Sequence, residues 1–394
     1  MKKCRFTISL VAAAFVIAGA GVRIAFASDS SGSTPIPPGP PKQGPGSTQY
    51  VCSSKKMWMS GEGDRQYWVF EPAGPTSAPV IIFNHGWSAM EPGPYEGWVD
   101  HLVRRGNIVI YPRYQASLST KADVFVESAA AATKDALARL SSEPGHVRPQ
   151  LDKLATVGHS AGGMVAAGLA AVGQSTGLPQ MKAVMCVEPG KSWGPPRLVI
   201  PLADMSKIPA STLLLTVAGE HDMVARDIDA RKIYDEARSI PKANKNFVML
   251  LTDDHGSPAL TASHFCPISP IVGGSAPGGE KLRRLQSASA DGSGLGAAGG
   301  QFGRNFRSAY FQRQIERLRS RQPGLFEERS DAPQPAANAV NALDYYGLWK
   351  LFDGLTDAAW YGKNRRYALG NTPEMRYMGK WSDGVPVKEI KVVQ

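Results

Sequence analysis

The sequence predicts an α/β fold, with a mostly parallel central sheet and helices on both of its faces. Short apolar runs alternate with segments of helical periodicity between residues 50 and 264. Near-continuous apolar strands separated by helices indicate a parallel sheet that is buried on both sides. One of these runs also leads into a Gly-x-Ser-x-Gly turn followed by a helix-forming segment, which is a strand–turn–helix pattern. An alternation of about 240 residues is typical of one large α/β domain rather than two.

The expected elements follow one another along the chain. The strands are runs dominated by aliphatic and aromatic residues, and the helices are longer segments in which apolar residues recur at helical spacing. The strands are expected at 66–70, 80–84, 107–111, 154–158, 182–187, 212–218 and 246–251, and the helices between them at 95–105, 122–140, 160–172 and 226–239. A strongly apolar segment at 341–361 predicts a last helix that packs back on the sheet.

The turn around Ser160 predicts a catalytic nucleophile. Gly158 and Gly162 flank the serine at the two positions where strand and helix must approach each other closely. The serine hydroxyl then stands clear of the backbone, and the backbone N–H of Ala161 at the helix start points toward a developing oxyanion. The alternative is a plain glycine-rich turn between strand and helix.

These pieces in this order resemble the α/β-hydrolases. The resemblance covers residues 50–264 and the helix from Asn341, and it implies a triad in the chain order serine, acid, histidine. The strand at 212–218 leads into Gly219-Glu220-His221-Asp222, the place where the family carries the acid. Asp222 is therefore the expected acid, which would orient the histidine and stabilise its imidazolium. Glu220 is the alternative on the same turn.

Two histidines compete for the role of base. His255 lies a few residues beyond the strand at 246–251, the usual distance in this fold. Ser263-His264-Phe265-Cys266-Pro267 instead resembles the Ser-His-Phe-x-Pro segment of bacterial polyester hydrolases and cutinases, but nine residues farther along. The base must reach Ser160, so we weigh spacing above local letters and predict His255. His264 remains the alternative.

A second oxyanion donor is expected after the strand at 80–84. Asn84-His85-Gly86-Trp87 resembles the His-Gly-x segment of α/β-hydrolases, which implies the backbone N–H of Trp87 as donor. A tight turn without that role is the alternative. No zinc-like Cys/His spacing, phosphate-binding loop or dinucleotide fingerprint occurs. We therefore expect neither a metal nor an organic cofactor.

The ends of the chain and one internal segment depart from the α/β pattern. Residues 1–27 have a basic start, an apolar stretch and Ala25-Phe26-Ala27, which together predict a cleaved secretory signal. Removing its four basic residues lowers the formal net charge from +10 to +6. Residues 28–49, rich in Ser, Pro and Gly, predict a disordered linker. The domain at 50–394 is interrupted at about 267–336 by a Gly-rich, then basic insertion, with one amphipathic helix expected at 308–320.

The reaction that fits these features is carboxylic-ester hydrolysis through an acyl-enzyme on Ser160. The connection between the strands at 182–187 and 212–218 spans about 24 residues, too few for a large cap domain. We therefore expect an open cleft for bulky or polymeric esters. The alternatives are a serine peptidase or amidase on the same fold and a non-catalytic binding protein.

Export and the lack of a second spanning segment predict a secreted or periplasmic monomer without stable membrane anchoring or nucleic-acid binding. Three cysteines remain after the signal is removed. Of these, Cys52 and Cys266 are the expected disulfide pair, and Cys186 is expected to be a buried free thiol.

Overall fold

The computed structural model describes residues 33–194, 196–269 and 340–394. The chain divides into a unit of residues 1–34 and a unit that runs from Pro35 to Gln394. The description below concerns the second unit. The expected signal at 1–27, the insertion from residue 270 onward and its expected helix at 308–320 lie outside the described residues. Among those that are described, no helix is long and apolar enough to span a membrane.

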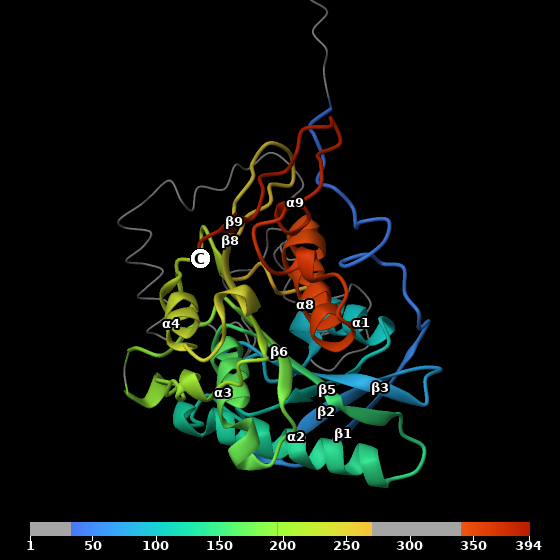
Figure 1. The fold of residues 1–394 in the computed structure, drawn as a ribbon, viewed down its shortest axis with the longest axis vertical. Coiled ribbons are helices and arrows are strands. Elements are labelled where there is room, and N and C mark those ends of the chain that lie inside the picture. The colour runs from blue at the N-terminus through green and yellow to red at the C-terminus, as the bar shows by residue number, and fades with distance from the viewer. Residues whose placement is uncertain (1–32, 195, 270–339) are drawn as a thin grey trace, which may run out of the picture. The chain divides into compact units, whose positions relative to one another are not determined.

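One sheet organises the described part of this unit (Figure 1). Its strands are β1 (Lys55–Ser60), β2 (Tyr67–Pro72), β3 (Ser77–Asn84), β4 (Ile108–Pro112), β5 (Arg148–His159), β6 (Met181–Val187), β7 (Leu213–Gly219), β8 (Lys245–Leu250) and β9 (Lys391–Val392). They lie in the order β1-β2-β4-β3-β5-β6-β7-β8-β9. The run from β4 to β8 is parallel, and β1, β2 and β9 are antiparallel to their neighbours.

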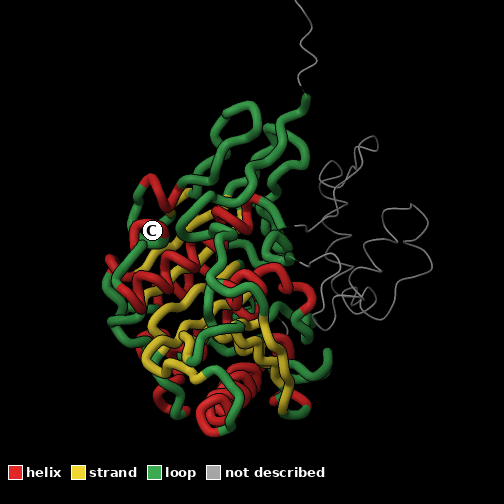
Figure 2. The backbone as a smooth tube through the Cα atoms, turned by 90° about the vertical axis from the view of Figure 1, so that its right-hand side faces the viewer, coloured by secondary structure: helices red, strands yellow, loops and turns green. Residues whose placement is uncertain are grey.

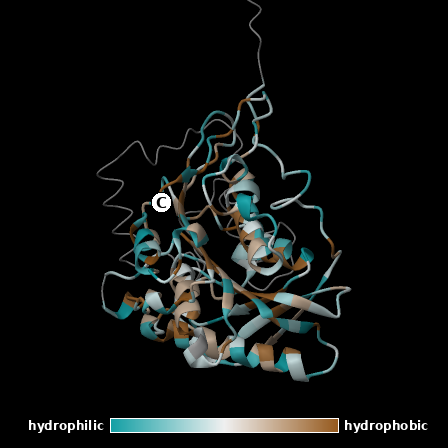
Figure 3. Cartoon of the chain, viewed as in Figure 1, coloured by the Kyte–Doolittle hydropathy of each residue, from teal (hydrophilic) through white to brown (hydrophobic). Residues whose placement is uncertain are grey.

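Helices cover both faces of the sheet (Figure 2). Helices α1 (Glu96–Arg104) and α8 (Lys350–Tyr361) pack on one face, and α2 (Phe125–Ser142), α3 (Ala161–Thr176) and α4 (Ile228–Glu236) on the other. A π-helical stretch, Leu343–Trp349, runs directly into α8, and the short α9 (Pro373–Arg376) follows it. Along α2 hydrophobic and hydrophilic residues alternate (Figure 3), which buries one side of the helix and exposes the other.

The strand residues alternate between the two apolar layers. Ile81 and Phe83 of β3 face the layer that contains α1 and α8, whereas Val80 and Ile82 face the layer with α2 and α3. A strand that is covered on both faces needs apolar residues at every position. The predicted parallel sheet with helices on both faces is therefore confirmed, and the seven predicted strands correspond to β2 through β8. The edge strands β1 and β9 were not predicted, because β1 has no buried position and no strict alternation and β9 is very short.

The expected disordered linker is wrong for the stretch that precedes β1. The N–H of Ile36 donates to the Ser382 hydroxyl at 3.0 Å, and that of Gly46 donates to the Asp353 carboxylate at 2.7 Å. At Gly46 (φ +80°) a Cβ atom would lie 2.2 Å from the Tyr345 carbonyl oxygen. The segment lies beside the C-terminal part of the chain (Figure 1). Its order rests on backbone hydrogen bonds, which a count of apolar side chains does not reveal.

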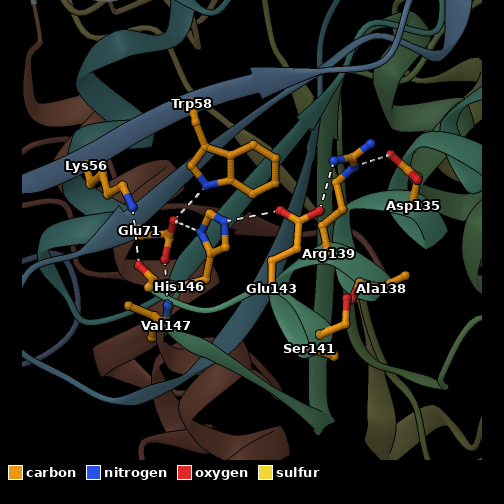
Figure 4. Close-up of polar contacts among 12 residues, drawn as sticks. Lys56, Trp58, Glu71, Asp135, Ala138, Arg139, Ser141, Glu143, His146 and Val147 are labelled. Carbon is orange, nitrogen blue, oxygen red and sulfur yellow. Dashed lines mark hydrogen bonds and ion pairs between the residues drawn. The ribbon is translucent and has the colours of Figure 1, made fainter.

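A buried carboxylate fastens the antiparallel strands to the parallel part of the sheet (Figure 4). Glu71 of β2 is 2% exposed. It accepts hydrogen bonds from Trp58 Nε1 of β1 at 2.6 Å, from His146 Nδ1 at 2.8 Å and from the Val147 N–H at 2.6 Å. His146 and Val147 directly precede β5, so one side chain joins three strands at the end of β5 opposite to Ser160.

Candidate active site

Ser160 sits on a sharp turn between β5 and α3. Its backbone is left-handed, with φ of +56°, a conformation that non-glycine residues rarely adopt outside strained turns. A Cβ atom at Gly158 would lie 2.0 Å from the Gly162 carbonyl oxygen, and one at Gly162 would lie 2.1 Å from that of Asn84. Only glycine fits at both positions, because the strand, the helix and the end of β3 meet there.

Ser160 is joined by hydrogen bonds to a histidine and, through it, to an aspartate. His264 Nε2 lies 2.9 Å from Ser160 Oγ, and His264 Nδ1 lies 2.9 Å from Asp222 Oδ2. The three residues come from three separate strand ends, after β5, β7 and β8. All three are buried. The expected positions of Ser160 and Asp222 therefore meet in space.

Asp222 is held as a carboxylate. Its Oδ1 accepts the backbone N–H groups of Val224 and Ala225, each at 2.8 Å. Burial acts to raise the pKa of this carboxyl, but the hydrogen bond and charge of His264, together with these N–H groups, hold the pKa below its ordinary value. The alternative acid, Glu220, points elsewhere and accepts the N–H of Thr252 at 2.9 Å.

The prediction that His255 reaches Ser160 is wrong. Its Nε2 lies 2.7 Å from Asp383 Oδ2, and its side chain is 35% exposed. After β8 the chain turns outward and returns, and Asp253 and Leu260 close this excursion by exchanging two backbone hydrogen bonds of 2.9 and 2.8 Å. His255 lies inside the excursion, so its short distance along the sequence brings it no closer to the site.

His264 lies just beyond that excursion. The Ala262 carbonyl accepts the N–H of His221 at 2.9 Å, which draws the returning chain to the end of β7. His264 lies nine residues farther from β8 than the usual spacing, and the loop between Asp253 and Leu260 accounts for this difference. The Ser-His-Phe-x-Pro resemblance indicated the histidine that lies beside Ser160, and counting residues from the strand did not.

The two expected oxyanion donors lie on either side of the turn. Ala161 is the first residue of α3, and Trp87 follows β3, with its ring 5.4 Å from that of Phe125. A Cβ at Gly162 would lie 2.5 Å from the His85 carbonyl oxygen, so this loop packs directly against the turn. Within the described part of the chain, neither the Trp87 nor the Ala161 N–H has a hydrogen-bond partner.

Behind these residues lies a largely buried polar cluster that was not predicted from the sequence. It consists of Tyr95, His159, Glu188 and Cys266. Burial and the nearby charge of His264 lower the pKa of His159 to about 3, so its imidazole is neutral. Burial, and then the charge of Asp222, raise the pKa of Glu188 well above its ordinary value. The available signal was the polar residues at the ends of apolar strands: His159 ends β5 and Glu188 follows β6.

Three side chains of this region are close enough to suggest a metal site. One potential ligand atom from each of His159, Glu188 and His264 lies within 4.8 Å of the others. However, His264 uses both ring nitrogens to contact Ser160 and Asp222, and His159 Nε2 lies 2.7 Å from the His264 carbonyl oxygen. A cation would have to displace these hydrogen bonds, so the donor set does not fit a resident metal.

The cysteines do not form the expected pair. Cys52, Cys186 and Cys266 are all free thiols. The Cys266 thiol faces Glu188 Oε1 at 3.5 Å, and burial raises its pKa well above the ordinary value. The Cys52–Cys266 disulfide is therefore wrong. Burial raises the pKa of the Cys186 thiol to about 12, as expected for an inert core cysteine.

Two large apolar side chains are exposed on loops beside the site. Trp193 follows β6 and Met223 follows Asp222, and they are 41% and 44% exposed. The N–H of Gly190 donates to the Ser160 carbonyl at 3.2 Å, so the loop that carries Trp193 starts at the nucleophile turn.

Comparison with known proteins agrees with this arrangement. Residues 49–197 match the family model of chlorophyllase, a segment that runs from before β1 to beyond β6 and includes Ser160. Together with the mostly parallel sheet, this match is consistent with the α/β-hydrolase superfamily. The match supports an ester hydrolase of the α/β-hydrolase type. It ends before Asp222 and His264. No curated protein gave a match.

Proposed function

We propose that this α/β-hydrolase is an exported serine esterase that works through an acyl-enzyme on Ser160. The single observation that supports it best is the order Ser160–His264–Asp222, with 2.9 Å at each step. In the proposal Ser160 is the nucleophile, His264 the general base and Asp222 the group that holds the imidazole in place. The export part of the proposal rests on the sequence of residues 1–27.

The first half-reaction forms the acyl-enzyme. Ser160 Oγ attacks the ester carbonyl carbon while its proton moves to His264 Nε2. The Asp222 carboxylate, kept ionised by its N–H partners, stabilises the resulting imidazolium. The N–H groups of Trp87 and Ala161, which have no hydrogen-bond partner among the described residues, would bind the oxyanion. When the tetrahedral intermediate collapses, the C–O bond to the alcohol breaks, and the alcohol leaves with the proton from His264.

The second half-reaction returns the free enzyme. Water attacks the acyl carbon and gives its proton to His264 Nε2. The bond from Ser160 Oγ to the acyl carbon then breaks, and the serine takes back that proton. The carboxylic acid departs. With the ester and one water molecule as reactants, the roles given to Ser160, His264 and Asp222 balance both steps.

The proposed substrates are esters with a bulky apolar part. Trp193 and Met223 are exposed apolar side chains on the loops that start at the Ser160 turn and at Asp222. The connection between β6 and β7 contains, among its described residues, two short 3₁₀ turns and no α-helix, so it forms no cap over that side. An open, partly apolar approach suits a large acyl or alcohol group. Since the matching family is chlorophyllase, chlorophyll belongs among the esters to be tested.

The test combines esterase assays with active-site labelling. p-Nitrophenyl esters of increasing acyl length, chlorophyll and aminoacyl anilides are assayed in parallel, and a fluorophosphonate probe labels reactive serines. We expect ester hydrolysis, weak or no anilide cleavage, and labelling that disappears in Ser160→Ala. Loss of the nucleophile lowers kcat by about 10⁶. If Ser160→Ala kept more than a few per cent of the activity, or the wild type cleaved only anilides, the proposal would be overturned.

A further inference from the structure

A chain of three buried hydrogen bonds connects the separate parts of the candidate site. The N–H of Gly86 lies 2.9 Å from Tyr95 Oη. Tyr95 Oη lies 2.8 Å from His159 Nδ1, and His159 Nε2 lies 2.7 Å from the His264 carbonyl oxygen. Tyr95 is 1% and His159 3% exposed. The chain therefore runs from the loop after β3, through the end of β5, to the loop that carries His264.

The donor and the acceptor of each of these three hydrogen bonds can be assigned. A backbone N–H only donates, so Tyr95 Oη accepts from Gly86 and has its own hydrogen left for His159 Nδ1. A carbonyl oxygen only accepts, so His159 Nε2 must carry the hydrogen that faces His264. These two demands describe one tautomer of a neutral imidazole. Burial keeps that imidazole neutral by lowering its pKa to about 3, and burial raises the pKa of Tyr95, which retains its hydrogen.

Each end of this series of hydrogen bonds lies at, or next to, a residue of the proposed reaction. Gly86 precedes Trp87, whose N–H is a proposed oxyanion donor. His159 precedes Ser160, and the carbonyl that it holds belongs to His264 itself. Neither Tyr95 nor His159 takes part in the proposed proton transfer. Their contacts instead join the His85–Gly86 peptide, which immediately precedes the proposed donor Trp87, to the carbonyl of His264.

We propose that Tyr95 and His159 are positioning residues that hold the His85–Gly86 peptide, next to the oxyanion donor Trp87, and the His264 carbonyl in register with Ser160. This inference rests on the proposed function. A misplacement of about 1 Å at such a site lowers the rate by about 100-fold. The substrate does not touch the buried pair, so the effect falls on kcat rather than on KM.

Tyr95 and His159 are closely packed against the residues around them. A Cβ atom at Gly86 would lie 2.8 Å from Tyr95 Oη and 3.1 Å from His159 Nδ1. The Tyr95 ring packs against Phe83 of β3, with 5.1 Å between ring centroids. The packing of the Tyr95 ring thus fixes the position of its hydroxyl group. Removing the hydroxyl alone leaves that ring packing in place.

The first experiment compares Tyr95→Phe with Tyr67→Phe, using a p-nitrophenyl ester. Tyr67 is also fully buried, and its hydroxyl donates to Asp135 on α2, away from the site. We expect Tyr95→Phe to lower kcat by about 10- to 100-fold with KM within about threefold, and Tyr67→Phe to keep kcat. Retention of kcat within twofold in Tyr95→Phe, or an equal loss in Tyr67→Phe, would overturn the inference.

A second pair of variants tests the polarity of the chain and also serves if Tyr95→Phe does not fold. The amide of His159→Gln offers an NH₂ group that donates and a carbonyl oxygen that accepts, so it can replace both roles of the neutral imidazole, whereas His159→Leu offers neither. We expect Gln to lose less than about tenfold in kcat and Leu about 100-fold. Equal losses in both would overturn the inference. Fluorophosphonate labelling of the wild type separates failure of this inference from failure of the proposed function. If the wild type were not labelled, the proposed function itself would be wrong.

Discussion

The two histidines that follow β8 are each paired with an aspartate, but the two pairs differ in their burial and in their neighbours. His255 and Asp383 approach to 2.7 Å with side chains 35% and 37% exposed. His264 and Asp222 approach to 2.9 Å with side chains 6% and 0% exposed. Water screens the first pair, so it gains little from its charges. The second pair lies where charge interactions are strong, and its other ring nitrogen faces a serine.

The comparison shows that a short ion-pair distance does not identify a catalytic pair. The exposed pair is in fact the shorter one. Burial, a hydrogen-bonded carboxylate and a nucleophile on the opposite nitrogen distinguish His264. These properties depend on which chain segments meet, and the loop closed by Asp253 and Leu260 decides that.

Replacing each of the two histidines in turn gives the largest predicted difference in kcat. We expect His264→Ala to lower kcat by about 10⁴- to 10⁶-fold, because Ser160 loses its proton acceptor. His255→Ala, the matched control, should stay within about threefold of wild type. Steady-state kinetics on one p-nitrophenyl ester measures both. The opposite ranking would mean that the spacing argument was correct and the observed geometry irrelevant to the reaction.

Substitutions of the two aspartates should also differ in their effect on kcat, although by a smaller factor than those of the histidines. Asp222→Asn keeps the shape of the side chain but cannot stabilise an imidazolium, and such a change lowers kcat by about 10⁴. Asp383→Asn is the control and should leave kcat within about twofold. A loss below about tenfold in Asp222→Asn would show that this carboxylate does not support the histidine.

The pH dependence of stability sharpens the contrast within the buried region. The pKa of Glu188 is raised in the fold, so its stabilising contribution is complete below the unfolded value, near 4.5, and declines as the pH rises toward the folded pKa. The pKa of Asp222 is lowered, so its contribution is present above the unfolded value, near 3.8, and declines as the pH falls.

We therefore expect Glu188→Gln to gain Tm relative to wild type as the pH rises from about 5 to 9, because the amide never has to ionise. Asp222→Asn should instead lose its Tm deficit as the pH falls below about 4. Thermal melts across this range measure both slopes. Parallel melting curves for wild type and Glu188→Gln would show that Glu188 is not held neutral.

The sequence by itself determined the sheet and the sharp turn that carries Ser160, the proposed nucleophile. The strands from β2 to β8 and the helix after Asn341 were predictable because burial on two faces demands nearly continuous apolar residues. Ser160 was predictable because only glycine fits at positions 158 and 162. Asp222 was predictable because it directly follows a strand end, where position in the sequence and position in space nearly coincide.

Only the tertiary structure decided which histidine faces Ser160 and how the site is supported. Residue counts do not reveal that the chain after β8 leaves the sheet and returns, so His255 lies nearer in sequence and His264 nearer in space. The contacts of Tyr95, His159 and Glu188 join segments separated by tens of residues, and no local pattern encodes them. Nor does composition show that the Pro-rich stretch before β1 is ordered by backbone hydrogen bonds to Ser382 and Asp353. Local sequence specifies strands and turns, whereas contacts between distant segments arise only when the whole chain packs.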